Sequence, residues 1–229
     1  MVTTKPVRRR ARTTALRDTT DALLDAAEFC FEEIGLSATT MEDIARQAGV
    51  SRATVYRHFA NRESVVSGVI LRTASRYLGR IRGPLAGQPD LGSAVLAFVE
   101  ITVRAATRDK SIAVLFVSDD RLAGIGLTEN TSVALFELVT EFLRPVFARH
   151  SNDLQPGISV DDAAEWILRT ILSLLTVRGP RRRSPDGLQT YLRRYLLPAI
   201  VVPGAESVSR HDDPAGRPCA RYTSAVVSP

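Results

Sequence analysis

The sequence predicts an all-α protein. Three observations support this fold class. Apolar residues recur at i, i+3 and i+4 in successive segments, residues that favour helix N-caps precede several of these segments, and glycines follow them. A chain of 229 residues that is 45% hydrophobic can bury a sizeable core, as one domain of moderate size or two small ones.

The N-terminal segment, residues 1–18, is expected to be a basic flexible arm. Residues 1–17 hold six basic side chains and no acidic one, which leaves 24 basic and 25 acidic residues in the rest of the chain. Too few apolar residues are present for the arm to fold alone. It is either a solvated tail that aids solubility or, with Arg8, Arg9 and Arg10, an arm that follows the DNA backbone or minor groove.

A first helix is predicted from about Thr19 to Ile34, with Gly35 as its stop. A second, short helix follows Thr40, whose side chain forms a capping box with Asp43. This helix ends at Gly49.

The third predicted helix starts at an N-cap, Ser51, and its angle is set by a hydrophobic staple between Val50 and Val55. Gly49 lies between the two short capped helices, where a tight turn requires positive φ. This arrangement is that of a helix-turn-helix motif, so residues 19–62 are expected to form a three-helix DNA-binding domain.

Once Val55 and Phe59 are assigned to packing, the remaining side chains of the third helix are mostly hydrogen-bond donors. The first residues of such a helix approach base edges in the major groove. A plain solvated helical hairpin is the alternative, but the arm, the caps and the turn glycine together favour DNA binding. The base-reading candidates are Arg52, Ala53 and Thr54, and the phosphate-binding candidates are Tyr56, Arg57, His58 and Arg62, the last beside the N-terminus of a fourth helix capped by Asn61.

Three segments resemble the tetracycline-repressor (TetR) family of bacterial transcriptional regulators. They are LLDAAEFCFEEIG, ATTMEDIARQAGVS and TVYRHFANRESV, in that order between Leu23 and Val66. The resemblance implies an N-terminal three-helix DNA-binding domain and a larger helical domain that dimerises and usually binds a small molecule. It places Thr40 and Tyr56 on the DNA backbone, Arg52 and Ala53 on bases, and His58 near phosphate.

This sequence departs from the family pattern at two DNA-binding positions. Ala53 stands where glycine is frequent, and Arg62 stands where lysine is common in the first turn of the fourth helix. Both keep the chemistry, but the extra methyl group of Ala53 bears on which bases are read.

The larger domain is expected to span residues 63–202. A long fourth helix should run from Asn61 to about Arg82 and stop at Gly83 and Pro84, and could carry a displacement to the third helix. Further helices are predicted near 91–108, 111–122, 128–149, 160–178 and 185–201, with a kink or break at Pro145. Residues 203–229 are expected to be a disordered tail.

The larger domain carries candidates for an effector pocket. Large apolar residues lie on four predicted helices, although each is also explained by plain core packing. Such a pocket would favour a hydrophobic or amphipathic effector. The candidates are Phe98, Ile101, Phe116, Phe136, Val139, Phe142 and Trp166.

The last two predicted helices have wide apolar faces that one chain's core need not absorb. Paired across a two-fold axis, they would form a four-helix homodimer interface, as the resemblance implies. The interface candidates are Ile167, Leu168, Ile171, Leu174, Leu175, Leu188, Leu192, Tyr195 and Leu196.

An enzyme is the rival class, and the sequence argues against it. The three histidines, His58, His150 and His211, are scattered, and Asp119 and Asp120 would point about 100° apart on a helix. No metal-ligand spacing, phosphate-binding glycine loop or nucleophile motif occurs. We therefore expect no catalytic residue, metal or cofactor.

Cys30 and Cys219 form no disulfide framework, and no apolar run is long enough to cross a membrane. Without a signal peptide, a cytoplasmic protein is expected. The sequence thus predicts a dimeric repressor of a double-stranded DNA operator, released by a small effector. The alternative is a DNA-binding regulator without an effector, controlled by a protein partner or by abundance.

Overall fold

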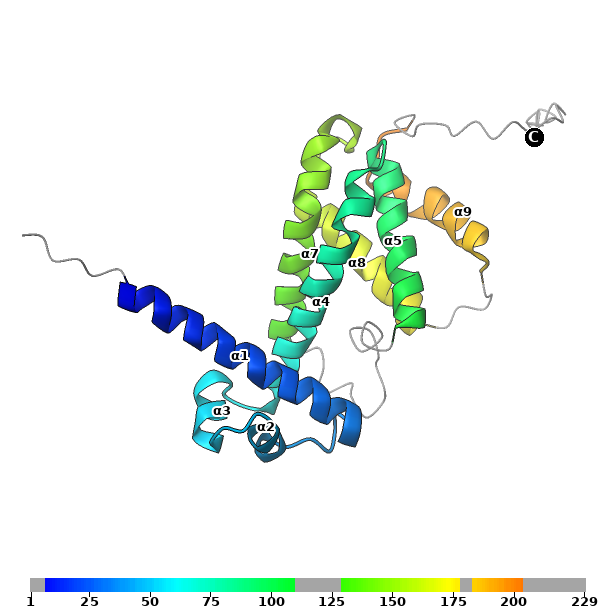
Figure 1. Cartoon of the computed structure of the whole chain (residues 1–229). Coiled ribbons are helices and arrows are strands. Elements are labelled where there is room, and N and C mark those ends of the chain that lie inside the picture. The colour runs from blue at the N-terminus through cyan, green and yellow to red at the C-terminus, as the bar shows by residue number, and fades with distance from the viewer. Residues whose placement is uncertain (1–6, 110–128, 178–182, 204–229) are drawn as a thin grey trace, which may run out of the picture.

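The structure is a computed structural model that describes residues 7–109, 129–177 and 183–203. These residues form helices joined by short turns, so the all-α prediction is confirmed (Figure 1). The helices are α1 (Val7–Ile34), α2 (Met41–Gln47), α3 (Arg52–His58), α4 (Arg62–Ala86), α5 (Leu91–Arg108), α7 (Glu129–Arg149), α8 (Val160–Thr176) and α9 (Pro185–Tyr195), with short 3-10 helices at Ser151–Asp153 and Leu197–Ala199.

Helices α1, α2 and α3 lie together at one end of the molecule, and we call them, with the first two turns of α4, the head (Figure 1). The rest of the described chain is the body. The head has its own small core, in which Leu23, Ile44 and Val55 are completely buried.

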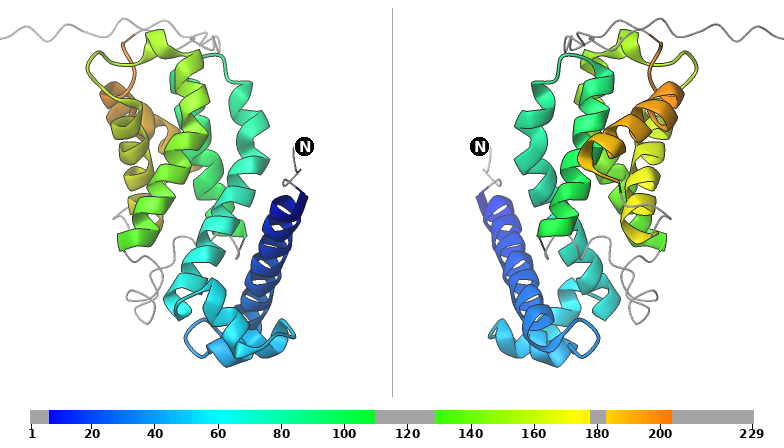
Figure 2. Two further views of the ribbon diagram at one scale, coloured as in Figure 1. Left: turned by 90° about the vertical axis from the view of Figure 1, so that its left-hand side faces the viewer. Right: turned by 90° about the vertical axis from the view of Figure 1, so that its right-hand side faces the viewer.

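Helix α4 leaves the head and continues into the body, where α5 and α7 lie beside it and α8 packs against α5 and α7 (Figure 1). Helix α9 packs on α5. Figure 2 shows α1 and α9 at opposite edges of the molecule. The side chains of α4 divide between the two cores: Val65 and Val69 belong to the head, and Val66 and Ile70 to the body. One continuous helix therefore joins the two parts.

The local helix signals are present in the structure. Thr40 and Asp43 form the capping box of α2, and the Ser51 side chain accepts a hydrogen bond from the Thr54 amide at the start of α3. Asn61 caps α4, and Gly49 has φ of 66°. These elements formed as predicted because each depends on neighbours within four residues.

The start of α1 and the end of α4 differ from the helix limits that we expected. Helix α1 begins at Val7, whereas we expected a helix only from about Thr19, so residues 7–18 are its first turns. Once a helix is nucleated, each added residue gains a hydrogen bond, and the arginines and alanines of this segment are good helix formers. Helix α4 continues through Pro84 to Ala86, where Leu85 is buried in the body core.

Two further expectations concern proline. Helix α7 runs unbroken through Pro145, so the helix is not divided there. Helix α9 ends at Tyr195, whereas we expected it to continue to residue 201. Pro198 cannot donate to the carbonyl of Arg194, and the chain instead forms a 3-10 turn that buries Ile200 and Val201.

Some predicted features lie outside the described residues: the helix at 111–122 with Phe116, the tail from residue 204, and Cys219. None of the helices in the described ranges is both long and apolar enough to cross a membrane.

Candidate DNA-binding face and effector groove

The first turn of α3 presents an exposed surface at the end of the head. Arg52 and Ala53 are exposed and Thr54 is partly exposed, while Val55 on the opposite side is completely buried. Val50 packs on the same core, as the staple requires. The three predicted base-reading residues thus lie next to one another in the first turn of α3, and none of them is buried.

Arg52 is held in place by two neighbours. Its Nη1 lies 2.5 Å from Oε1 of Glu42 on α2, and its Nη2 donates to the Tyr56 hydroxyl at 3.4 Å, with the guanidinium 5.3 Å from the centre of the Tyr56 ring. The hydrogen bond to Tyr56 and the charge of Glu42 raise the pKa of Arg52 above its ordinary value. Because the side chain remains largely exposed, it is oriented without being removed from solvent.

Sequence reasoning missed Glu42. It lies in the first turn of α2, where an acidic residue is already explained by the helix dipole. Only the packing of α2 against α3 brings it to Arg52.

Thr40 uses its side chain within the head. Its hydroxyl accepts a hydrogen bond from the Asp43 amide and donates to Asp43 Oδ2 at 2.6 Å, while the Thr40 amide donates to the same oxygen at 3.0 Å. These hydrogen bonds hold the pKa of Asp43 below its ordinary value. Thr40 is exposed at the N-terminus of α2, and its hydroxyl is already engaged in the helix cap.

Arg62 and His58 also have partners inside the head, which the sequence did not reveal. Arg62 Nε donates to the carbonyl of Thr39 at 2.9 Å, and its Nη2 donates to the carbonyl of Leu36. His58 Nδ1 lies 3.0 Å from the Thr20 hydroxyl. The guanidinium of Arg62 therefore ties the start of α4 to the segment between α1 and α2, instead of extending freely toward a phosphate.

The other phosphate candidates keep their exposure. Tyr56 and Arg57 are exposed on α3. Arg8, Arg9 and Arg10 lie in the first turn of α1, and their side chains are not among those described.

The predicted effector residues do not surround one described cavity. Phe98 and Val139 are buried in the body core, and the rings of Phe98 and Phe142 are 5.9 Å apart. Ile101 packs at the edge of this core, whereas Trp166 is exposed on α8. Four of the predicted effector residues, Phe98, Ile101, Val139 and Phe142, thus belong to the core of a single chain or pack at its edge.

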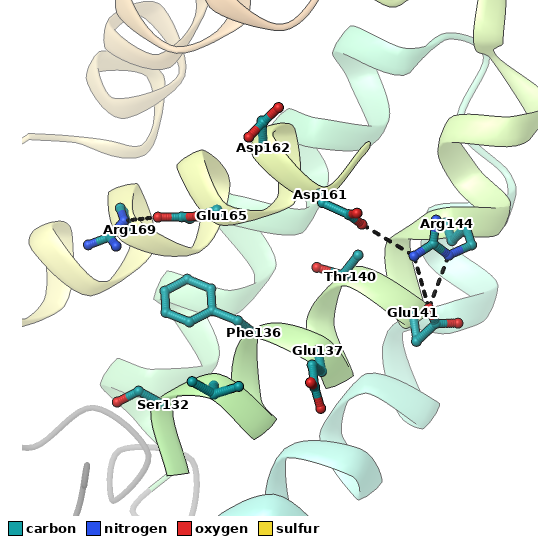
Figure 3. A pocket seen from close by; sticks show the side chains of 11 residues that line it. Ser132, Phe136, Glu137, Thr140, Glu141, Arg144, Asp161, Asp162, Glu165 and Arg169 are labelled. Atoms are coloured by element: carbon teal, nitrogen blue, oxygen red, sulfur yellow. Dashed lines mark hydrogen bonds and ion pairs between the residues drawn. The ribbon is translucent and has the colours of Figure 1, made fainter. Parts of the chain in front are cut away.

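A groove of about 740 Å³ runs between α7 and α8 (Figure 3). Phe136 extends from α7 toward α8, and the guanidinium of Arg169 lies 5.5 Å from its ring centre. Arg144 bridges Glu141 and Asp161 at 3.0 and 3.2 Å. The groove is lined by Ser132, Val133, Phe136, Glu137, Thr140, Glu141, Arg144, Asp161, Asp162, Glu165 and Arg169.

This groove differs from the apolar site that the sequence suggested. Five carboxylates and two guanidinium groups line it, so it is amphipathic and predominantly acidic. A second hollow of about 170 Å³, between the ends of α4 and α7, includes Phe142 and Pro145.

Five of the nine predicted dimer residues lie in the core of a single chain. Ile167, Ile171 and Leu192 are completely buried in the core of a single chain, and Leu168 and Leu196 are nearly so. They have no surface left to bury against a second copy. The apolar faces of α8 and α9 were predicted correctly, but the body of the same chain absorbs them.

Four large apolar side chains of the body are exposed in a single chain, and one of them, Tyr195, belongs to the predicted set. Trp166 on α8 is 47% exposed and Tyr195 at the end of α9 is 59% exposed. Val133 on α7 and Val177 after α8 are also exposed. Leu174, Leu175 and Leu188 from the predicted set are partly buried.

Comparisons with known proteins agree with the head geometry. The family model described as bacterial regulatory proteins, tetR family, matches residues 23–69. The chain is 32% identical over 190 residues to the HTH-type transcriptional repressor KstR2 of Rhodococcus jostii, covering 81% of this chain and 90% of that protein. The protein belongs to the TetR family.

Two other similarities extend over most of this TetR-family chain. It is 29% identical over 200 residues to an uncharacterized HTH-type transcriptional regulator of Mycobacterium tuberculosis, covering 86% of this chain and 91% of that one. The crystal structure of the TetR family repressor AlkX from a Dietzia strain matches with a TM-score of 0.56 and 26% identity, over 78% of this chain and 94% of that chain. The protein is therefore a transcriptional regulator of a non-enzymatic family, as the sequence indicated.

Proposed function

We propose that this regulator is a homodimeric repressor that binds an inverted-repeat DNA operator and is released by a small amphipathic effector. The observation that carries DNA binding is the first turn of α3, where Arg52 and Ala53 are exposed and Thr54 is partly exposed at the tip of the head. An oriented arginine at this position suits bidentate recognition of guanine.

The dimer proposal is supported by large aromatic side chains that a single chain leaves exposed. Trp166 on α8 is 47% exposed, and Tyr195 at the end of α9 is 59% exposed. A two-fold axis that brings these aromatic side chains of two copies together would bury them in the interface and leave the α7–α8 groove free for an effector.

This dimer can be tested by Trp166→Lys and Tyr195→Lys. Each should shift the full chain toward monomer in light scattering at micromolar concentration, because a new positive charge would be buried in the interface. Phe29→Lys, at a comparably exposed apolar residue on α1, is the control and should leave the mass unchanged. A wild-type chain that is monomeric would contradict the proposal directly.

In such a dimer the two recognition helices would lie about 34–36 Å apart, one turn of DNA. A footprint on DNA flanking the protein's own gene should show two protected half-sites related by a two-fold axis. Tyr56→Phe should weaken binding to all sequences alike by removing a phosphate contact. A wild-type protein that protects no site would contradict the DNA-binding proposal.

The effector is the finer part of the proposal. The α7–α8 groove combines an aromatic side chain with carboxylates, which suits an amphipathic molecule, and the similar repressor from Dietzia is implicated in biodegradation of n-alkanes. Long-chain alkylammonium, fatty acid and n-alkane probes should therefore be tested for release of the operator. Affinity can change only by the difference in effector binding between the free and DNA-bound states.

A regulator without an effector is the second candidate. It is favoured by the core positions of Phe98 and Val139, two of the residues expected to line a pocket. If no amphiphile or hydrocarbon changes operator affinity while the footprint persists, this second candidate is the better description.

A further inference from the structure

One face of α4 changes from apolar to basic where the helix passes from the head to the body. Val65 and Val69 lie on this face and pack in the head core. Arg72 and Arg76 follow at i+7 and i+11 from Val65, so they continue the same stripe along the helix. The stripe that faces α1 therefore ends in two arginines.

These arginines meet acidic side chains on α1. Arg72 Nη1 lies 2.8 Å from Asp25 Oδ1, and Arg72 Nη2 lies 2.8 Å from Glu28 Oε1. Arg72 Nη1 also donates to the backbone carbonyl of Asp21 at 2.9 Å. Arg76 approaches the same two carboxylates more loosely, at 3.7 and 3.5 Å.

Arg72 is enclosed, whereas Arg76 is not. The Arg72 side chain is only 10% exposed, compared with 57% for Arg76. Arg72 thus contacts Asp21, Asp25 and Glu28, which follow one another at successive turns along one face of α1. Arg76 places a second positive charge near Asp25 and Glu28. We call Arg72 and its partners Asp25 and Glu28 the clamp.

A close contact lies one helical turn before the clamp, at Gly68. A Cβ atom at Gly68 would lie 2.9 Å from Leu24 Cδ2 and 3.1 Å from Phe59 Cε1, so this part of α4 packs directly on α1 and on the end of α3. Val65, Gly68 and Val69 thus hold the first two turns of α4 against the head. Arg72 extends this contact by one further turn, to the part of α4 that lies in the body.

The chemistry of the clamp favours a geometric role over a purely stabilising one. Among the described residues, Arg72 Nε has no hydrogen-bond partner, and its Nη2 pairs with Glu28 as a charge without hydrogen-bond geometry. Buried ion pairs of this kind often add little to stability compared with apolar residues. An apolar residue would not select one orientation of α1 in the same way.

We propose that Arg72 is a positioning residue that fixes the angle between head and body, and thereby sets the operator half-site spacing that the dimer accepts. This inference rests on the proposed function, because spacing has meaning only for a dimer on an inverted repeat. Inserting one base pair moves a half-site by about 3.4 Å and rotates it by about 34°. A rigid head rejects such a site, and a head freed at the clamp can follow it.

The decisive test uses full-length wild type, Arg72→Met and Arg80→Met. Arg80 is the matched control because it is exposed on the same helix and pairs with Asp109, away from α1. A duplex selected from a random pool by the wild type is resynthesised with its centre lengthened or shortened by one and two base pairs. Wild type and Arg80→Met should lose at least about tenfold in affinity on the altered duplexes, and Arg72→Met less than about threefold.

Two results would overturn the inference. Arg72→Met could retain the wild-type discrimination between spacings, or it could lose affinity equally on every duplex, which would make Arg72 a general contributor to binding. Binding to an isolated half-site should be the same for all three proteins, since the recognition helix itself is intact.

A second pair of changes guards against misfolding of Arg72→Met. The double variant Asp25→Asn, Glu28→Gln breaks the clamp from α1, where both carboxylates are less enclosed, and should relax spacing discrimination in the same way. Retained discrimination in this variant would contradict the proposal as strongly.

Failure of the proposed function gives a different result. If the wild type selects no duplex, the repressor proposal fails, and hydrogen exchange still tests the clamp. Amides of α1 near Asp25 should exchange at least about tenfold faster in Arg72→Met than in Arg80→Met, since loss of the clamp frees this part of α1. Unchanged exchange would overturn the positioning role independently of DNA.

Discussion

The head and the body differ in the size of their hydrophobic cores. Among the described residues, the head core contains 11 buried side chains and the body core contains 27. Both parts use helix caps, at Thr40 and Ser51 in the head and at Asp90, Ser159 and Ser184 in the body. The head adds the hydrogen bonds of Arg62 to the α1–α2 segment. Because the head core is smaller, the loss of one core side chain removes a larger share of its buried apolar surface.

The largest expected difference comes from the same substitution in each part. Ile44→Ala in the head and Ile171→Ala in the body both remove a completely buried side chain, and each should cost about 2–5 kcal/mol. In the small head core this is enough to unfold α1–α3 locally, so hydrogen exchange should rise there and DNA binding should be lost. Ile171→Ala should lower the melting temperature but keep half-site binding.

The comparison would fail if Ile44→Ala and Ile171→Ala changed exchange throughout the chain in the same way. The two parts would then unfold as one cooperative unit.

Arg52→Ala tests the open polar face of the head. It should weaken the specific site by about 1–3 kcal/mol and relax sequence preference at the contacted base. Fluorescence anisotropy on specific and random duplexes measures both effects. Arg169→Ala in the body groove is the control and should not alter sequence preference; equal losses on both duplexes for Arg52→Ala would remove its base-reading role.

Substitution of the N-terminal arginines tests whether the start of α1 contacts DNA phosphates. Replacing Arg8, Arg9 and Arg10 with glutamine should reduce the slope of log affinity against log salt by about 2–3. Sequence preference should be unchanged, because contacts to phosphates carry no base information. An unaltered slope would make this part of α1 a solubility element.

The smallest effect concerns the capping box. The hydrogen bonds from Thr40 lower the folded pKa of Asp43 from its ordinary value of 3.8, so this carboxylate stabilises the head above about pH 4 and loses that effect as the pH falls through the lowered folded pKa. Thr40→Ala should cost about 1 kcal/mol at neutral pH. It should also reduce the fall in melting temperature between about pH 5 and pH 3.

Thr107→Val is the control for the capping box. The Thr107 hydroxyl donates to a backbone carbonyl and to no carboxylate among the described residues. A Thr40→Ala variant with the same acid dependence as this control would show that the cap does not act through Asp43.

Sequence reasoning succeeded where the cause of a structure lies within a few residues. The starts of α2, α3 and α4 follow from Thr40, Ser51 and Asn61, and the turn at Gly49 follows from its positive φ. It was wrong at Pro84, because the burial of Leu85 keeps the last turn of α4 helical, and that burial involves a distant part of the chain.

The functional surfaces show the same division. The donors of α3 could be predicted because a short helix with Val55 on one side must expose the other. The dimer residues could not, because an apolar stripe such as that of Ile167 and Ile171 is the same whether it faces its own core or a second copy. The pairing of Arg52 with Glu42 likewise joins residues of two different helices.

The sequence by itself therefore determined the all-α fold, the helix-turn-helix of the head and the identity of its exposed donors, since caps, turns and amphipathic spacing are local properties. Only the tertiary structure decided which apolar faces are core, which arginines pair within the head and how α4 is fastened to α1. Those outcomes depend on which helices lie against one another, and the spacing of residues along one helix carries no record of its neighbour.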